Sequence, residues 1–129
     1  MDIVSALFAE SIDLRPMPGP SMRLDLLGIM FSTPAPSAPP VTVTPHLIVL
    51  VRCRAHEDGQ GILEVVFRDE DGAQVARNVS PFQVEPGKFT YRLVRGELEF
   101  SKLGTIEAHC RLLPDGAATV VPLMLLPPL

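Results

Sequence analysis

The sequence predicts an all-β protein: one domain, residues 1–129, built as a two-sheet antiparallel β-sandwich of about 7–8 strands with little helix. Three observations support this prediction. Aliphatic side chains recur with a period of two in several short stretches, Asp-Gly and Pro-Gly pairs separate these stretches, and the 14 prolines and 9 glycines are spread between apolar runs. An immunoglobulin-like or C2-like sandwich fits this pattern best, and a small closed barrel is the structural alternative.

The first third of the chain predicts two strands and a proline-rich connection. Residues 2–11 are expected to form a strand rather than a helix, because the run is short and prolines follow it closely. Residues 22–31 alternate and then change phase at Gly28, as at a bulge or bend. Residues 32–45 hold five prolines and predict a loop or crossover. Residues 46–54 are apolar on both faces, which indicates a central strand.

Two hairpins dominate the rest of the chain. Residues 62–76 predict the first one, since Asp71 and Gly72 supply the residues that a tight turn needs between two alternating runs. Two further strands on either side of a Pro-Gly turn are expected within residues 80–93. Residues 104–126 repeat the hairpin plan, with a proline inside the returning strand that indicates an edge strand or a bulge.

The charge and hydropathy patterns exclude several classes of protein. A net charge of −4 and few basic residues argue against a nucleic-acid partner, which would require clustered Lys and Arg. No apolar run approaches the roughly twenty residues of a membrane-spanning helix. The first ten residues carry an acid at position 2, where a secretory signal would carry a base. We therefore expect a cytoplasmic protein.

The two cysteines, Cys53 and Cys110, are both predicted to point into the core. Their separation suits a bridge between two sheets, so a disulfide is geometrically possible. The expected compartment and the absence of tryptophan favour two free, buried thiols that act as small hydrophobic residues.

Candidate ligand sites are weak. Five acidic residues fall on two segments that we expect near one end of the sandwich, where C2-type domains bind calcium, although no interleaved Asp-x-Asp-x-Asp loop is present: Glu57, Asp58, Asp69, Glu70 and Asp71. His46, His56 and His109 show no zinc-binding spacing. No serine lies in a Gly-x-Ser-x-Gly motif, and no glycine-rich phosphate loop precedes a helix. We therefore predict no catalytic, cofactor-binding or metal-binding residue and no enzyme.

Apolar surface beyond the needs of one core is the strongest functional signal. The outward side of the first hairpin and the C-terminal strand are both apolar, and soluble monomers rarely leave such patches in water. The candidate interface consists of six residues: Ile62, Val66, Leu123, Met124, Leu125 and Leu126. We expect a non-catalytic interaction or structural module that associates with itself or with another protein. The alternative is a sandwich that binds calcium, a carbohydrate or a lipid headgroup at its acidic loops.

The strand at residues 22–31, with its Leu-Leu-Gly step, and the two later hairpins resemble a family of small uncharacterised bacterial proteins with a domain-of-unknown-function label. The corresponding parts are residues 26–31, 33–45, 69–72 and 104–126. The resemblance covers nearly the whole chain and rests on turn and core patterns. It implies a β-sandwich and no catalytic residues. Pro122 in the closing strand departs from the family pattern and affects the final edge pairing.

Overall fold

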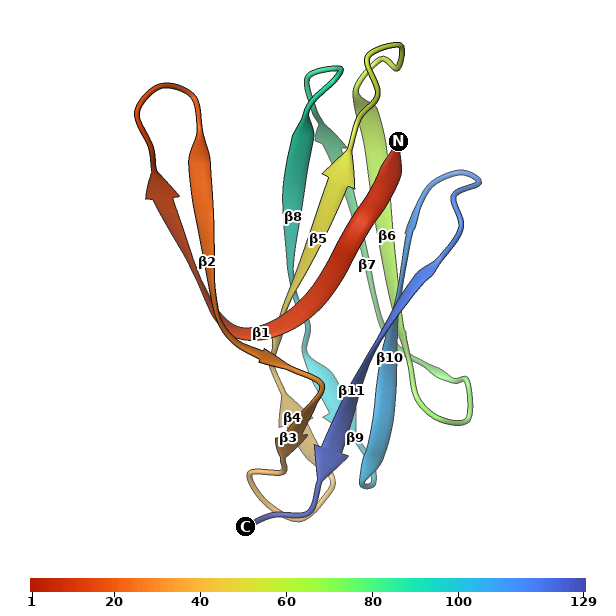
Figure 1. Cartoon of the computed structure of the whole chain (residues 1–129). Helices are drawn as coiled ribbons and strands as arrows, with labels where there is room; N and C mark the ends of the chain where they lie inside the picture. The colour runs from red at the N-terminus through yellow and green to blue at the C-terminus, as the bar shows by residue number, and fades with distance from the viewer.

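The computed structural model describes residues 1–129 and contains eleven β-strands and no helix (Figure 1). The all-β prediction is confirmed. Eight strands have seven or more residues and three have only three. In chain order the strands are β1 (Asp2–Pro16), β2 (Met22–Met30), β3 (Ser32–Pro34), β4 (Val41–Val43), β5 (His46–Arg52), β6 (Gln60–Arg68), β7 (Gln74–Gln83), β8 (Phe89–Arg95), β9 (Leu98–Phe100), β10 (Gly104–Leu112) and β11 (Thr119–Leu126).

The strands form two large sheets and one small ribbon. Sheet A has four strands in the order β2-β1-β5-β8, and sheet B has five in the order β3-β11-β10-β6-β7. The short strands β4 and β9 pair at the end of the molecule where the C-terminus lies (Figure 1). Every pair is antiparallel except β3 and β11, which run parallel. The expectation of purely antiparallel sheets is wrong here, because part of the proline-rich segment becomes an edge strand rather than a loop.

The core consists of 22 buried residues contributed by both sheets and by the connections between them. Alternation predicted its members correctly on three strands. The side chains of Leu47, Val49 and Val51 on β5 are fully buried, and so are those of Leu63 and Val65 on β6. On β10 the alternate positions Ile106, Ala108, Cys110 and Leu112 are all buried. Strand β5 lies between β1 and β8, as expected of a central strand.

The predicted hairpin at residues 62–76 is confirmed as β6 and β7. Asp69 organises its turn: its carboxylate accepts hydrogen bonds from the backbone N–H groups of Asp71 and Ala73 at 3.0 Å each. Gly72 adopts a positive φ of 81°, a conformation that side chains disfavour. Because β7 continues to Gln83, the segment expected as a separate strand after residue 80 belongs to this same hairpin.

The second hairpin is confirmed as β10 and β11. Pro122 lies opposite Glu107 on β10, while β3 pairs with β11 only from Met124 onward. The other edge of β11 is therefore open at Pro122, where the missing backbone N–H costs no sheet hydrogen bond. The sequence prediction of an edge position for this proline is correct.

Strand β1 has two different neighbours along its length. Its first half, as far as Ala9, pairs with β5, and its second half pairs with β2 as far as Pro16. Beyond Ala9 the β5 side of β1 is unpaired, so residues 10–28 form a two-stranded projection, here called the arm. Figure 1 shows the arm in red and orange, standing away from the rest of the sheets. Gly28, with φ of 66°, lies at its base, where the sequence predicted a bend.

Candidate interaction surface

The solvent side of sheet A, here called the outer face, is largely apolar. Strand register places Leu7, Ile48 and Leu93 in one row across β1, β5 and β8, opposite to the side chains that enter the core. The next row contains Leu50 and Tyr91. Leu93 is 43% exposed, and Phe89 at the end of β8 is 66% exposed. These side chains adjoin one another across the sheet, but Ile48 is buried at 2% exposure, so the accessible apolar strip consists of Leu93 and Phe89 with the half-buried Leu7, Leu50 and Tyr91 beside them.

The arm adds further exposed apolar side chains. Ile29 pairs with Ala9 and Leu27 pairs with Ser11, so both continue the outer face onto the arm. Leu27 is 59% exposed and Ile29 is 48% exposed, and Leu14 and Met22 nearer the tip are similarly accessible. A two-stranded hairpin has no core of its own and is marginally stable alone. The arm therefore exposes to water aliphatic side chains that another layer of protein packed on it would bury.

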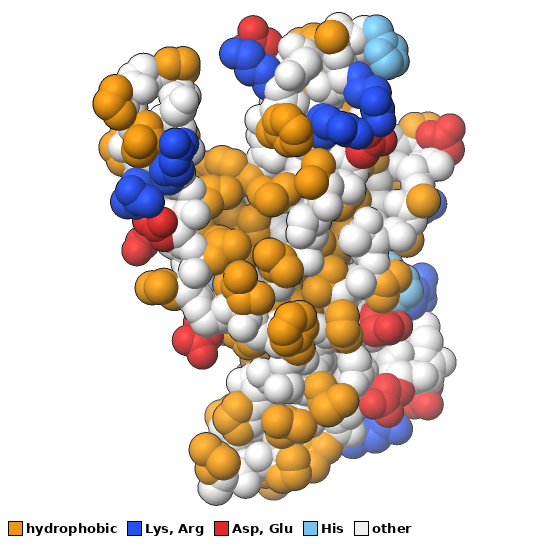
Figure 2. Space-filling model, viewed as in Figure 1, with side chains coloured by type: hydrophobic (Ala, Val, Ile, Leu, Met, Phe, Trp, Pro, Cys, Tyr) orange, Lys and Arg blue, Asp and Glu red, His pale blue; other side chains and the backbone are white.

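The arm and the outer face enclose a groove with a volume of ≈ 420 Å³. Figure 2 shows it as a hollow between the arm and the body, with hydrophobic side chains along its floor and charged side chains on the arm beside it. The arm groove is lined by Pro20, Ser21, Met22, Arg23 and Leu24 of the arm and by Leu50, Phe89, Thr90 and Tyr91 of sheet A. It is an open groove, suited to an extended chain or a protein edge rather than to an enclosed small molecule.

Charges on the arm are arranged in an unusual register. Asp13 lies directly opposite Asp25, and Arg15 lies directly opposite Arg23. Such like-charged pairs are unfavourable unless diagonal contacts compensate for them. One diagonal does so: the Arg15 guanidinium contacts both carboxylate oxygens of Asp25, which lowers the pKa of Asp25 and raises that of Arg15. No ion pair includes Asp13, and Arg23 contacts only the neighbouring backbone carbonyl of Met22.

The interface predicted from the sequence is wrong for three of its six residues. Leu123 and Leu125 are 0% and 2% exposed and belong to the core, and Val66 is also buried. On β11 both faces are apolar, so alternation could not tell which face is internal. Ile62, Met124 and Leu126 are exposed, as expected.

These three exposed residues do not form one patch. Met124 lies beside Thr105 at one end of β10, whereas the carbonyl of Ile62 accepts a hydrogen bond from Leu113 beyond the other end. Paired charged residues of β6 and β10 lie between these two positions on the same face. The predicted contact surface is therefore divided by polar side chains.

Glu64 lies at the centre of these charged residues. Its carboxylate accepts hydrogen bonds from Arg77 on β7 at 2.8 and 3.1 Å and from Arg111 on β10 at 2.8 Å. These contacts, with Arg111 the stronger, lower the pKa of Glu64. Alternation along β6 puts Glu64 on the side opposite to Leu63 and Val65, but gives no sign of its burial, to 8% exposure, between the two arginines. The sequence does show acidic and basic residues alternating on the outward side of these strands. This alternation could be interpreted as a charged cluster only once the strand order was known.

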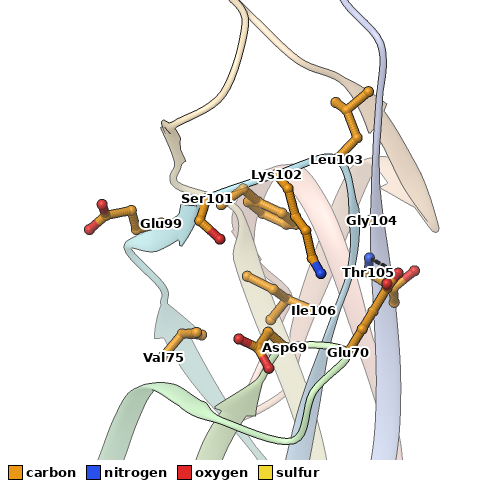
Figure 3. A pocket seen from close by; sticks show the side chains of 11 residues that line it. Asp69, Glu70, Val75, Glu99, Ser101, Lys102, Leu103, Gly104, Thr105 and Ile106 are labelled. Carbon is orange, nitrogen blue, oxygen red and sulfur yellow. Dashed lines mark hydrogen bonds between the residues drawn. The ribbon is translucent and has the colours of Figure 1, made fainter.

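A small cavity of ≈ 40 Å³ lies where the β6–β7 turn meets the loop before β10 (Figure 3). Glu70 crosses from the turn, and its Oε1 accepts a hydrogen bond from the backbone N–H of Thr105 at 2.8 Å. Lys102 lies 3.7 Å from Asp71 and joins the same two loops. The cavity has room for about one or two water molecules. The Glu70–Thr105 and Lys102–Asp71 contacts, here called the latch, join the β6–β7 turn to the loop before β10.

An open polar hollow of ≈ 520 Å³ adjoins this latch and contains one histidine, His109. The Nε2 atom of His109 lies 3.5 Å from Glu107. The carboxylates of Asp69 and Glu70 also line the hollow, but backbone N–H groups already occupy them. Glu107 and His109 lie beside each other on the exposed side of β10.

The acidic residues of the calcium prediction lie at opposite ends of β6. Glu57 and Asp58 precede this strand, whereas Asp69, Glu70 and Asp71 follow it. The expectation that they share one end is wrong, because a single strand of nine residues separates the two groups. Each group has structural contacts: Glu57 contacts the N-terminal amine and the backbone of Arg54, and Asp58 accepts a hydrogen bond from the N–H of Gln60. No cluster of three potential metal ligands is present.

The cysteines and the other histidines are also placed separately. Cys53 and Cys110 are free and buried, in agreement with the favoured prediction. Burial raises the pKa of Cys110 to about 12, which keeps it a thiol. His46 contacts the backbone carbonyl of Glu10 through Nδ1, and His56 lies in the exposed loop before β6.

No helix in the structure could cross a membrane. No protein-family model, no curated protein and no solved structure matches the chain. The surface described above therefore has to be interpreted from its own geometry and chemistry.

Proposed function

We propose that the two sheets form an immunoglobulin-like sandwich. Three strands of sheet A, in the order β1-β5-β8, correspond to strands A, B and E of that fold, and β11-β10-β6-β7 correspond to G, F, C and an added C′ strand. The parallel strand β3 beside β11 is a second segment of strand A that has changed sheets. Cys110 then lies on strand F and Cys53 directly follows strand B, the two strands that a disulfide joins in antibody domains.

On this scaffold we propose a non-catalytic protein-interaction module that associates with itself through the arm and the outer face of sheet A. The observation that supports it is the apolar strip that runs from sheet A onto the arm and lines the arm groove. A standard protein interface takes about 20–30 residues from each partner, which the arm and the outer face together can supply. This proposal replaces the surface expected from the C-terminal strand, half of which is internal.

The proposal is tested by comparing two single substitutions of exposed aliphatic residues. Leu27→Lys places a charge on the arm at a position that is 59% exposed, and Ile62→Lys places the same charge on sheet B at a position that is 41% exposed. Size-exclusion chromatography with light scattering, from low to high micromolar protein, should show an oligomer for the wild type and for Ile62→Lys. Leu27→Lys should shift the protein to monomer, because the lysine would have to be desolvated in the contact.

Two outcomes contradict the proposal. A wild-type protein that stays monomeric at every concentration refutes self-association. An oligomer that Ile62→Lys disrupts and Leu27→Lys leaves intact moves the contact to sheet B. Far-ultraviolet circular dichroism of both variants establishes that each is folded before its mass is interpreted.

A further inference from the structure

The arm carries charged side chains of both signs. It contains three acids, Glu10, Asp13 and Asp25, and two bases, Arg15 and Arg23. A partner with a strongly acidic or basic surface would be matched by an arm of the opposite sign, and this arm has no dominant sign. The surface is instead mixed, and its internal pairing is incomplete.

One acidic and one basic side chain of the arm have no ionic partner. Arg15 and Asp25 neutralise each other, which leaves Asp13 and Arg23 without an ionic partner on adjacent strands of the same hairpin. Register places both on the side of the arm that also carries Leu27 and Ile29. Arg23 in addition lines the arm groove. An unpaired acid and an unpaired base on one surface are complementary to the same surface of a second copy.

We propose that two copies of this chain associate about a two-fold axis, with the arm of each copy in the arm groove of the other. Asp13 of each copy then pairs with Arg23 of the second copy. In a two-fold contact every pair occurs twice, with the roles of the copies exchanged. The inference rests on the self-association proposed above and adds its partner, its symmetry and its specific charge pair.

The backbone supports the same arrangement. From Glu10 to Pro16, strand β1 has β2 on one edge and no strand on the other, since its pairing with β5 ends at Ala9. An open strand edge with apolar side chains is a template for another chain. A second chain can pair along this edge, while the groove is lined on its arm side by β2 and the turn before it.

The test uses charge reversal and mixing. Asp13→Arg leaves two bases facing each other across the contact, and Arg23→Asp leaves two acids, so each variant alone should dimerise about tenfold or more weakly than the wild type. In an equimolar mixture of the two variants both contacts become Arg–Asp pairs. The mixture should therefore form a heterodimer of near wild-type affinity, detected by native mass spectrometry. The double variant Asp13→Arg with Arg23→Asp should also recover its homodimer.

The matched control is Asp115→Arg, a reversal of the same kind in the exposed β10–β11 turn, which should leave dimerisation unchanged. If the mixture does not restore dimerisation, or if Asp115→Arg weakens dimerisation as much as the arm variants do, the reciprocal pairing is overturned. The proposed function still holds in that case if the wild type forms an oligomer that Leu27→Lys disrupts. A wild type that remains monomeric overturns both. A monomer that sediments with phosphatidylcholine vesicles through its arm also overturns the inference, with a lipid surface as the partner.

Discussion

Strand β11 offers a direct test of where the core ends, because Leu123 and Leu126 have the same chemistry and opposite environments. Leu123 is fully buried beside Ile106, whereas Leu126 is 37% exposed. Replacing a fully buried leucine with alanine removes its hydrophobic contribution and leaves a cavity, which together cost about 3 kcal/mol. The same change at a surface position costs about 0.5 kcal/mol.

These energies convert into melting temperatures. An unfolding entropy of about 2.1 cal/mol/K per residue gives roughly 0.27 kcal/mol/K for a chain of 129 residues. Leu123→Ala should therefore lower Tm by about 11 °C and Leu126→Ala by about 2 °C.

Far-ultraviolet circular dichroism is the suitable assay, since the chain has no tryptophan and a single tyrosine. Both variants are measured at a protein concentration where their oligomeric state is the same. Equal losses of Tm would refute the assignment of the two faces of β11. A greater loss for Leu126→Ala would show that the surface side carries the contact that the sequence originally suggested.

Two further predictions concern the latch and the charged cluster of sheet B. A β-carbon at Gly104, whose φ is +143°, would lie 2.7 Å from Oε1 of Glu70. Gly104→Ala should therefore lower the free energy of unfolding by about 1–2 kcal/mol, measured by thermal or urea unfolding, and the double variant Gly104→Ala with Glu70→Ala should recover part of this loss. An unchanged Tm in Gly104→Ala would contradict the contact. The lowered pKa of Glu64 means that the unfolded chain binds its proton more readily, so its stabilisation is present above pH 4.5 and is lost as pH falls through the folded-state pKa. Glu64→Gln should therefore make unfolding less pH-dependent below pH 4.5 than in the wild type, and identical pH profiles would show that the two arginines do not hold this carboxylate in its charged form.

The sequence predicted the two hairpins and the inward faces of β6 and β10 because those strands alternate with one apolar and one mixed face. The same reasoning failed on β11, where Leu123 and Leu126 look equivalent along the chain. Only the packing of Ile106 against Leu123 decides which side is internal. A period of two identifies faces, and it identifies the core only when the second face is polar.

The arm could not be predicted for a different reason. The pattern of residues 2–16 gives no sign of where the strand leaves the sheet, since that point is fixed by the start of β5 at His46, which pairs with Ala9. The burial of Glu64 likewise depends on Arg77 and Arg111, which are distant in sequence and adjacent only through strand order. Both features follow from long-range pairing, which local spacing does not encode.

Strand β1 runs without interruption from the core into the arm, and this continuity has a consequence for how the protein can vary. Residues can be inserted or removed symmetrically beside the turn at Met17–Ser21, two on each strand, and every remaining side chain keeps its face. The reach of the projection can therefore change in discrete steps while the folded body stays as it is. An odd-numbered change would turn the tip at Met17–Ser21 to the opposite side of the arm, while the charged residues Asp13, Arg15, Arg23 and Asp25, which lie nearer the body, would keep their side.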